Sequence, residues 1–189
     1  MKNKIFAFVG TTGVGKTYYS KYLVENHGLH YIPSVTTRPP GEGNLDEYIH
    51  FTDEEYQKMI ENMELLEYTV FNGYYYGKRT NDVFSYLEKG HCVYTLTADR
   101  AAELKDKIPE TVIVHLSLAE PIVENTILRI SERNLSKKEL NNRIKTIESD
   151  LKDIAELEYK GLIDHKIITL EGDKHATFGE LDQLITKYI

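Results

Sequence analysis

The chain of 189 residues contains a single cysteine and no tryptophan. One cysteine excludes an intrachain disulfide and a cysteine-based zinc site, and the apolar neighbours of Cys92 predict that it is buried. The sequence also has no apolar run near the ~18 residues of a membrane span and no signal-peptide pattern, so we expect a cytoplasmic protein without a membrane partner. Basic residues number 23 against 30 acidic ones, and the net charge of −7 argues against non-specific binding of nucleic acid.

What the chain does contain is an alternation of strand-like and helix-like segments. Apolar, often β-branched runs predict strands at 5–9, 92–96, 111–116 and 166–170. Helices are expected near 16–26, 100–107, 121–130, 138–160 and 178–188. Such an alternation predicts an α/β fold in which a parallel sheet carries helices on both faces.

Directly after the first expected strand, residues 10–17 match the phosphate-binding loop pattern G-x-x-x-x-G-K-[ST]. Glycines let the backbone curl with its N–H groups toward phosphate oxygens, and the following helix adds its positive end to the anion site. Lys16 can neutralise the β- and γ-phosphates, and the Thr17 hydroxyl can ligate Mg²⁺. The loop therefore predicts a P-loop core that binds ATP with Mg²⁺. Its ATP-binding residues would be Gly10, Thr11, Thr12, Gly13, Val14, Gly15, Lys16 and Thr17.

Two segments break the alternation. Residues 34–81 mix strand and helix patterns and predict a lobe inserted into a core made of 1–33 and 82–189. A polar stretch at about 131–142, with Arg129, Arg133 and Arg143 in or beside it, predicts a short arginine-bearing lid. A P-loop core with such additions is typical of an enzyme that closes over two phosphate-bearing substrates.

Inside the inserted lobe, local signals predict a short strand at 48–51, a longer strand at 65–71 and a turn region at 73–77. Thr52 and Glu55 form a capping-box pattern at the start of a helix. That helix is expected to bury one face, formed by Tyr56, Met59, Ile60 and Met63.

Several motifs in the lobe, taken together and in register, resemble the guanylate kinase family. They read Ser-Val-Thr-Thr-Arg at 34–38, Gly-Glu at 41–42, Asp-Glu-Tyr at 46–48, Glu-Leu-Leu-Glu-Tyr at 64–68 and Asn-Gly-Tyr-Tyr-Tyr-Gly at 72–77. The resemblance runs from the P-loop to at least Arg143. Guanylate kinases transfer the γ-phosphoryl group of MgATP to GMP. The resemblance therefore implies a nucleoside-monophosphate kinase with ATP and Mg²⁺ as donor and cofactor, and with GMP or dGMP as acceptor.

The resemblance also implies roles for individual side chains. The acceptor phosphate would be held by Ser34, Arg38, Tyr48 and Tyr76. Glu67 would accept from the two adjacent donors of the guanine edge, and Gly77, Lys78 and Thr97 would complete the acceptor site. The planar arginine fork stays charged and binds two oxygens at once, which suits a phosphoryl group in transfer. The catalytic cations would be Lys16, Arg38, Arg129, Arg133 and Arg143.

The chain departs from the family pattern on the acceptor and metal side. No second arginine follows Pro40, so one phosphate clamp is missing. Thr95 and Thr97 stand where the family has two acidic residues, and Lys78 replaces a small hydroxyl residue and could donate to guanine O6. Two other interpretations stay open: a kinase of a different phosphorylated acceptor, or a non-catalytic module that binds nucleotide or a partner.

Each site residue has a structural interpretation as well. Glu67 could be a solvated strand carboxylate, and Tyr76 one of three strand aromatics. Arg129 and Arg133 lie four residues apart on an expected helix and could pair with surface acids such as Glu132. The sequence does not predict an oligomeric state.

Overall fold

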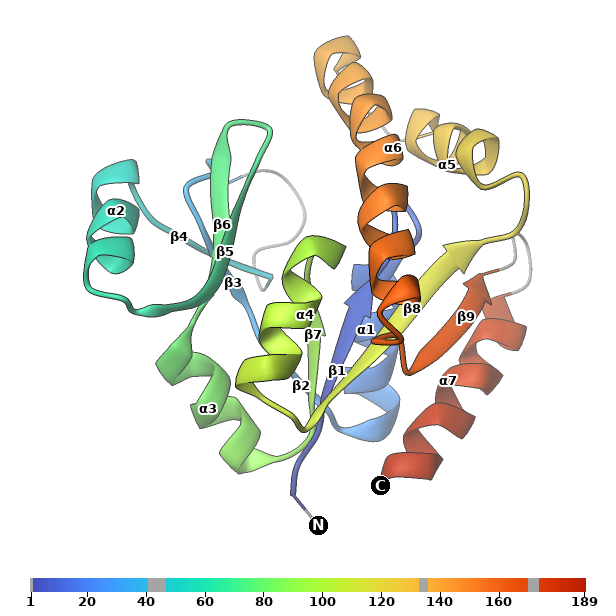
Figure 1. Ribbon diagram of the computed structural model, residues 1–189, viewed down its shortest axis with the longest axis horizontal. Helices are drawn as coiled ribbons and strands as arrows, with labels where there is room; N and C mark the ends of the chain where they lie inside the picture. Colours follow the sequence, from blue (N-terminus) through green and yellow to red (C-terminus); the bar gives the residue numbers. More distant parts are fainter. Residues whose placement is uncertain (1, 41–46, 133–135, 170–173) are drawn as a thin grey trace.

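A computed structural model describes residues 2–40, 47–132, 136–169 and 174–189 of the chain, and Figure 1 shows their arrangement. The elements, in chain order, are β1 (Ile5–Val9), α1 (Lys16–His27), β2 (His30–Tyr31), β3 (Ser34–Thr36), β4 (Tyr48–His50), α2 (Asp53–Glu61), β5 (Leu65–Phe71), β6 (Tyr74–Arg79), α3 (Thr80–Lys89), β7 (Cys92–Thr95), α4 (Ala98–Lys107), β8 (Thr111–Leu118), α5 (Ile122–Ser131), α6 (Lys137–Tyr159), β9 (His165–Thr169) and α7 (Lys174–Tyr188).

The core sheet has the strand order β2-β7-β1-β8-β9, and every neighbouring pair in it is parallel. All five residues of the central strand β1 are buried, as expected for a strand covered on both faces. Because parallel strands end at the same edge of a sheet, the loops after β1, β7 and β8 lie next to one another. That edge carries the P-loop.

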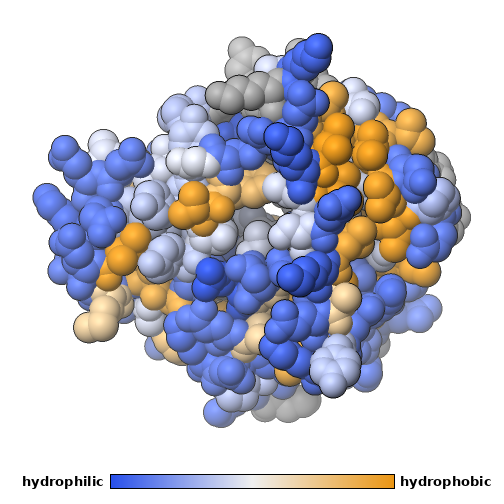
Figure 2. Space-filling model, turned by 45° about the horizontal axis from the view of Figure 1, so that its top comes forward, coloured by the Kyte–Doolittle hydropathy of each residue, from blue (hydrophilic) through white to orange (hydrophobic). Residues whose placement is uncertain are grey.

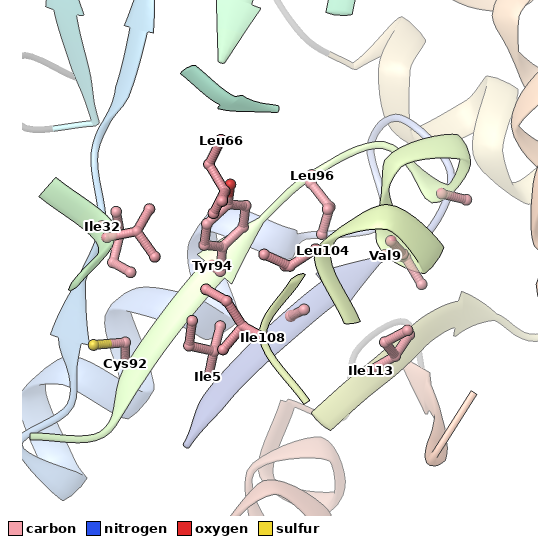
Figure 3. Close-up of a cluster of buried hydrophobic side chains, with 14 of the residues drawn as sticks. Ile5, Val9, Ile32, Leu66, Cys92, Tyr94, Leu96, Leu104, Ile108 and Ile113 are labelled. Atoms are coloured by element: carbon pink, nitrogen blue, oxygen red, sulfur yellow. The ribbon is translucent and has the colours of Figure 1, made fainter. Parts of the chain in front are cut away.

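Alternate residues of β1 pack on opposite faces of this sheet. Ile5 and Val9 belong to a buried cluster that also holds side chains of α3, α4 and α6, drawn in Figure 3. Phe6 and Phe8 belong to a second cluster with side chains of α1 and α7. The predicted α/β fold with helices on both faces is confirmed, and Cys92 is buried in the first cluster as predicted.

A second, smaller sheet with the order β4-β3-β6-β5 forms the lobe that stands to the left of the core sheet in Figure 1. β6 pairs antiparallel with β3 and β5, while β4 runs parallel to β3. The helix α2 begins with the predicted capping box, in which Thr52 and Glu55 each accept a hydrogen bond from the other's backbone N–H. Tyr56 and Met59 of this helix pack with Val35 of β3 in a small core of the lobe's own.

Two expectations for the lobe were wrong. α2 ends at Glu61, and Met63 has a φ of 55° and is 86% exposed, because the chain turns there toward β5. The expected turn region at 73–77 is mostly strand: only Asn72 and Gly73 have positive φ, and β6 starts at Tyr74. A two-residue Asn-Gly connection is the ordinary hairpin turn, so the tyrosines after it continue the ladder.

The predicted lid falls partly outside the described residues, since 133–135 are not described. α5 ends at Ser131, and α6 begins at Lys137 and continues for 23 residues. The later part of the predicted lid is thus the start of a long helix that continues onto the core. Among the described helices, none combines the length and the apolarity needed to cross a membrane.

Candidate active site

The P-loop joins β1 to α1 along a path that requires glycine at particular positions. Gly10 passes so close to β8 that a Cβ atom there would lie 2.3 Å from the Leu116 carbonyl oxygen. Gly15 has a φ of 104°, in the left-handed region, and directly precedes α1. The loop therefore leads directly into the positive end of α1, which favours an anion beside it.

Two side chains of the loop are oriented by hydrogen bonds. Lys16 Nζ donates to the carbonyl oxygens of Gly10 at 2.7 Å and Thr11 at 3.1 Å, so the ammonium lies across the loop. Thr17 Oγ1 donates to Glu47 Oε2 at 3.3 Å. Because Glu47 directly precedes β4, this bond links the core to the lobe.

A cleft separates the P-loop from the lobe sheet, and Figure 2 shows a hollow with a mainly hydrophilic rim. Most of the predicted site residues line this cleft, although they are spread over more than 130 positions of the sequence. Those that line it are Gly10, Thr12, Lys16, Thr17, Ser34, Arg38, Tyr48, Glu67, Tyr76, Gly77, Thr97 and Arg143.

The wall beside β4 and β6 carries two phenols and faces two arginines. The rings of Tyr48 and Tyr76 meet edge to face with 5.9 Å between their centroids. Burial raises the pKa of both phenols, and the charges of Arg38 and Arg143 oppose that rise. Both phenols therefore stay protonated, and an arginine of the lobe and one of α6 act on the same place from two sides.

Glu67 lies deep in the cleft and is 7% exposed, so its interpretation as a solvated strand carboxylate is wrong. Its Oε1 accepts a hydrogen bond of 2.8 Å from the Tyr94 hydroxyl. Burial raises the pKa of the Glu67 carboxyl, while the Tyr94 hydrogen bond and the nearby Lys78 charge lower it. A buried carboxylate with acceptor capacity left over suits a ligand with paired N–H donors.

Lys78 does not lie where a lysine reading guanine O6 would lie. Its side chain is 1% exposed and does not line the cleft. Nζ donates instead to the Ile32 carbonyl oxygen at 2.6 Å and to Ser34 Oγ at 2.9 Å. The position before it, Gly77, is too close to the Glu67 backbone for any side chain, which fixes β6 tightly against β5.

The helix α6 brings two polar side chains to the P-loop. Arg143 Nη1 donates to Thr12 Oγ1 at 2.9 Å, and Asp150 Oδ2 accepts from the Thr12 backbone N–H at 3.0 Å. Burial raises the pKa of Asp150, and the charge of Lys16 lowers it. The third residue of the loop is thus held by α6 through both its side chain and its backbone.

The other two predicted arginines behave differently. Arg129 Nη1 donates to the Val14 carbonyl oxygen at 3.3 Å, so Arg129 contacts the P-loop but does not line the cleft. Arg133 lies outside the described residues.

Comparison with known proteins decides the family. The guanylate kinase family model matches residues 2–174. The chain belongs to the guanylate kinase family. It is 28% identical to the guanylate kinase of Lactococcus lactis over 98% of this chain and 93% of that protein. It is 32% identical to that of Oceanobacillus iheyensis over 84% of this chain and 78% of that protein. The crystal structure of guanylate kinase from Anaplasma phagocytophilum shares the fold, with a TM-score of 0.69 at 18% identity over 98% of this chain and 86% of that one.

Membership of the guanylate kinase family confirms the resemblance and the prediction of a nucleotide-binding kinase. Within this kinase, the two threonines that replace acidic residues both line the cleft. Thr95 Oγ1 lies 3.2 Å from the Tyr31 hydroxyl. Thr97 Oγ1 is buried and has no hydrogen-bond partner among the described residues. Asp99, a third candidate acid, pairs with Arg100 at 3.0 Å and does not line the cleft.

Sequence reasoning missed several residues of this kinase site. Glu47 belongs to the Asp-Glu-Tyr motif at 46–48, in which the sequence predicts a role for Tyr48 but none for Glu47. Asp150 follows Arg143 by seven residues and therefore shares its helix face, a spacing that could have found it. The other lining residues that were missed are Thr69, Phe71 and Leu96, for which no local sequence signal exists.

Proposed function

We propose that this protein transfers the γ-phosphoryl group of MgATP to GMP or dGMP, giving ADP and GDP or dGDP. The observation that carries the proposal is that the P-loop lysine, Lys16, lines the same cleft as Ser34, Arg38, Tyr76 and the buried Glu67. One end of such a cleft suits a triphosphate, and the other suits a monophosphate with a base that offers paired donors.

In the proposed reaction an oxygen of the acceptor phosphate attacks the γ-phosphorus, and the bond from phosphorus to the β–γ bridging oxygen breaks. ADP leaves with that oxygen, and the acceptor's phosphate dianion needs no general base. Charge on the transferring group is met by Lys16 from the loop, Arg38 from the lobe and Arg143 from α6. Their task is alignment and charge stabilisation, which dominate catalysis of phosphoryl transfer.

Base selection is assigned to Glu67. Guanine presents N1–H and an exocyclic amine side by side, and one carboxylate can accept from both. Adenine lacks this pair, so it would leave a buried carboxylate without donors. Leaving a buried group unsatisfied costs about 1–3 kcal/mol.

The residues beside the P-loop fit a Mg²⁺ ion bound with ATP. Thr17 Oγ1 and Glu47 Oε2 are 3.3 Å apart, and both are hard oxygen donors of the kind that Mg²⁺ prefers. Glu47 Oε1 is buried and accepts no hydrogen bond from the described residues, although Lys21 Nζ lies 3.5 Å away. Thr17 and Glu47 would hold the ion, and its charge would neutralise the β- and γ-phosphates.

The test is ADP release in a coupled assay with MgATP and a panel of acceptors: GMP, dGMP, AMP, CMP, UMP and a sugar phosphate. GMP or dGMP should be the best acceptor, and Lys16→Met should remove nearly all turnover. A better rate with AMP or a sugar phosphate would mean a kinase of another acceptor. GMP binding without turnover would mean a non-catalytic module.

A further inference from the structure

Lys78 is a lysine enclosed in the interior, at the place where the lobe joins the core. The chain enters the lobe through the segment from β2 to β3 and returns to the core after β6. Lys78 on β6 bonds to Ile32 and Ser34, so it links the entering segment to the returning one. Tyr94, which Figure 3 shows between Ile32 and Leu104, has its ring centroid 4.5 Å from Lys78 Nζ.

The hydrogen bond to Ser34 has a fixed direction. An ammonium group has donors and no acceptor, so Ser34 Oγ must accept. A serine hydroxyl has one proton, and with Lys78 on the acceptor side that proton is left to donate elsewhere. Ser34 lines the cleft, as do Arg38 and Tyr76.

Lys78 also places a positive charge near the lobe side of the cleft, where few other cations lie. No second arginine follows Pro40, and Arg38 is the one cation of the described lobe residues that lines the cleft. A buried cation behind Ser34 acts through protein rather than water, and its field is therefore weakly screened.

We propose that Lys78 is a positioning residue for the acceptor phosphate: its ammonium fixes the Ser34 hydroxyl as a donor toward the cleft and supplies charge behind it. The inference rests on the proposed function, because it takes a phosphorylated acceptor as the ligand. It also gives the lysine a task other than contact with the base.

The surroundings of Lys78 make its charge sensitive to pH. Burial lowers the pKa of its ammonium to about 8, although the charges of the Glu67 carboxylate on β5 and the Glu47 carboxylate before β4 oppose this decrease. The rings of Tyr94 on β7 and Tyr31 on β2 also face it, at 4.5 and 5.5 Å. Since the folded pKa is lowered, the charge is present below about pH 8 and is lost above it.

The experiment compares the parent with Lys78→Met, Ser34→Ala and the double variant. For each we would measure the KM for GMP, the KM for ATP, and the Kd for GMP by calorimetry without ATP. Lys78→Met should raise the KM and Kd for GMP about tenfold and leave the KM for ATP within about twofold. The double variant should be little worse than the worse single one, because residues that act through one contact are not additive.

The second readout is pH. Between pH 7 and 9 the Kd of the parent for GMP should rise severalfold, and in Lys78→Met and Ser34→Ala the rise should be much smaller. Lys107→Met is the matched control, because Lys107 also donates to a backbone carbonyl of the lobe, but its partner Leu66 does not line the cleft as Ser34 does.

Additive effects of the two substitutions, or equal loss of GMP and ATP binding, would overturn the inference in favour of a plain structural tether. If Lys78→Met does not fold, Ser34→Ala is the deciding variant. A Kd for GMP that rises with pH in Ser34→Ala as much as in the parent would contradict the proposed action of Lys78 through Ser34. If the parent binds GMP without turnover, the proposed function is wrong. The inference about Lys78 is then tested by the Kd values for GMP from calorimetry. A parent that binds no GMP overturns both.

Discussion

At the scale of single residues, the site depends on carboxylates whose surroundings the sequence does not reveal. Glu47 and Glu67 are both nearly buried, yet their partners differ: Glu47 meets the Thr17 hydroxyl, and Glu67 meets that of Tyr94. These contacts join positions 27 or more residues apart. Local pattern alone therefore could not distinguish the carboxylate proposed to bind metal from the one proposed to bind the base.

The base-reading task of Glu67 can be tested by Glu67→Gln. An amide accepts with one atom and donates with the other, so one of the two guanine donors loses its acceptor. We expect kcat/KM for GMP to fall by about 1–3 kcal/mol in transition-state free energy, with the KM for ATP unchanged. The exposed Glu88→Gln on α3 serves as control, and parent-like use of GMP by Glu67→Gln would refute the assignment.

The metal-supporting task of Glu47 predicts a different loss. Glu47→Gln should weaken binding of Mg²⁺ to the ADP complex about tenfold, because a charged oxygen beside Thr17 becomes a neutral amide. Calorimetric titration with Mg²⁺ measures this directly, without turnover. Glu61→Gln, on the exposed side of α2, should bind Mg²⁺ like the parent. Equal affinities in all three proteins would leave the ion to Thr17, nucleotide and water alone.

At the scale of elements, the sequence predicted well what local chemistry controls. Periodicity gave the core strands and helices, and the capping box gave the start of α2. The sequence wrongly predicted a turn region at 73–77, where β6 lies. The Gly-Tyr-Tyr-Tyr-Gly stretch has turn residues at both ends, but only the first glycine turns the chain. Gly77 is there for close packing, with 2.6 Å from its would-be Cβ to the Glu67 carbonyl oxygen, a tertiary requirement that no local rule anticipates.

In the proposed reaction, the helix α6 contributes to catalysis through Arg143, which bonds to Thr12 of the P-loop. Arg143→Ala should lower kcat by on the order of 10²-fold, because an arginine at the transferring phosphoryl group acts mainly in the transition state. Its bond to Thr12 predicts a smaller rise in the KM for ATP. Steady-state kinetics would check this beside Lys145→Ala, an exposed residue of the same helix. A variant that loses only ATP affinity would reduce Arg143 to a support of the loop.

At the scale of the whole molecule, the cleft is shared by the core, which has two buried clusters, and the lobe, which has a small cluster of its own and contributes Leu66 to one of the core clusters. The bond from Thr17 to Glu47 and the bonds from Lys78 are contacts that join the two parts beside the cleft. A nucleotide bound at the P-loop and one bound at the lobe should therefore stabilise the folded molecule through different residues.

Thermal unfolding offers a test of this division. ADP with Mg²⁺ and GMP should each raise the Tm of the parent, since both bind only the folded chain. Lys16→Met should lose most of the shift given by ADP and keep the shift given by GMP. If Lys16→Met lost both shifts equally, the two nucleotides would not occupy separate halves of the cleft.

The strand order has a consequence for how the protein is made. β1 and β2 are synthesised before β7 and β8, but they are not neighbours: β7 lies between them, and β8 lies on the other side of β1. Gly10 packs against Leu116, so the nucleotide-binding turn is synthesised well before the strand against which it packs. We therefore expect a nascent chain arrested before residue 111 not to bind ATP, because β1 then lacks β7 or β8, or both, as neighbours.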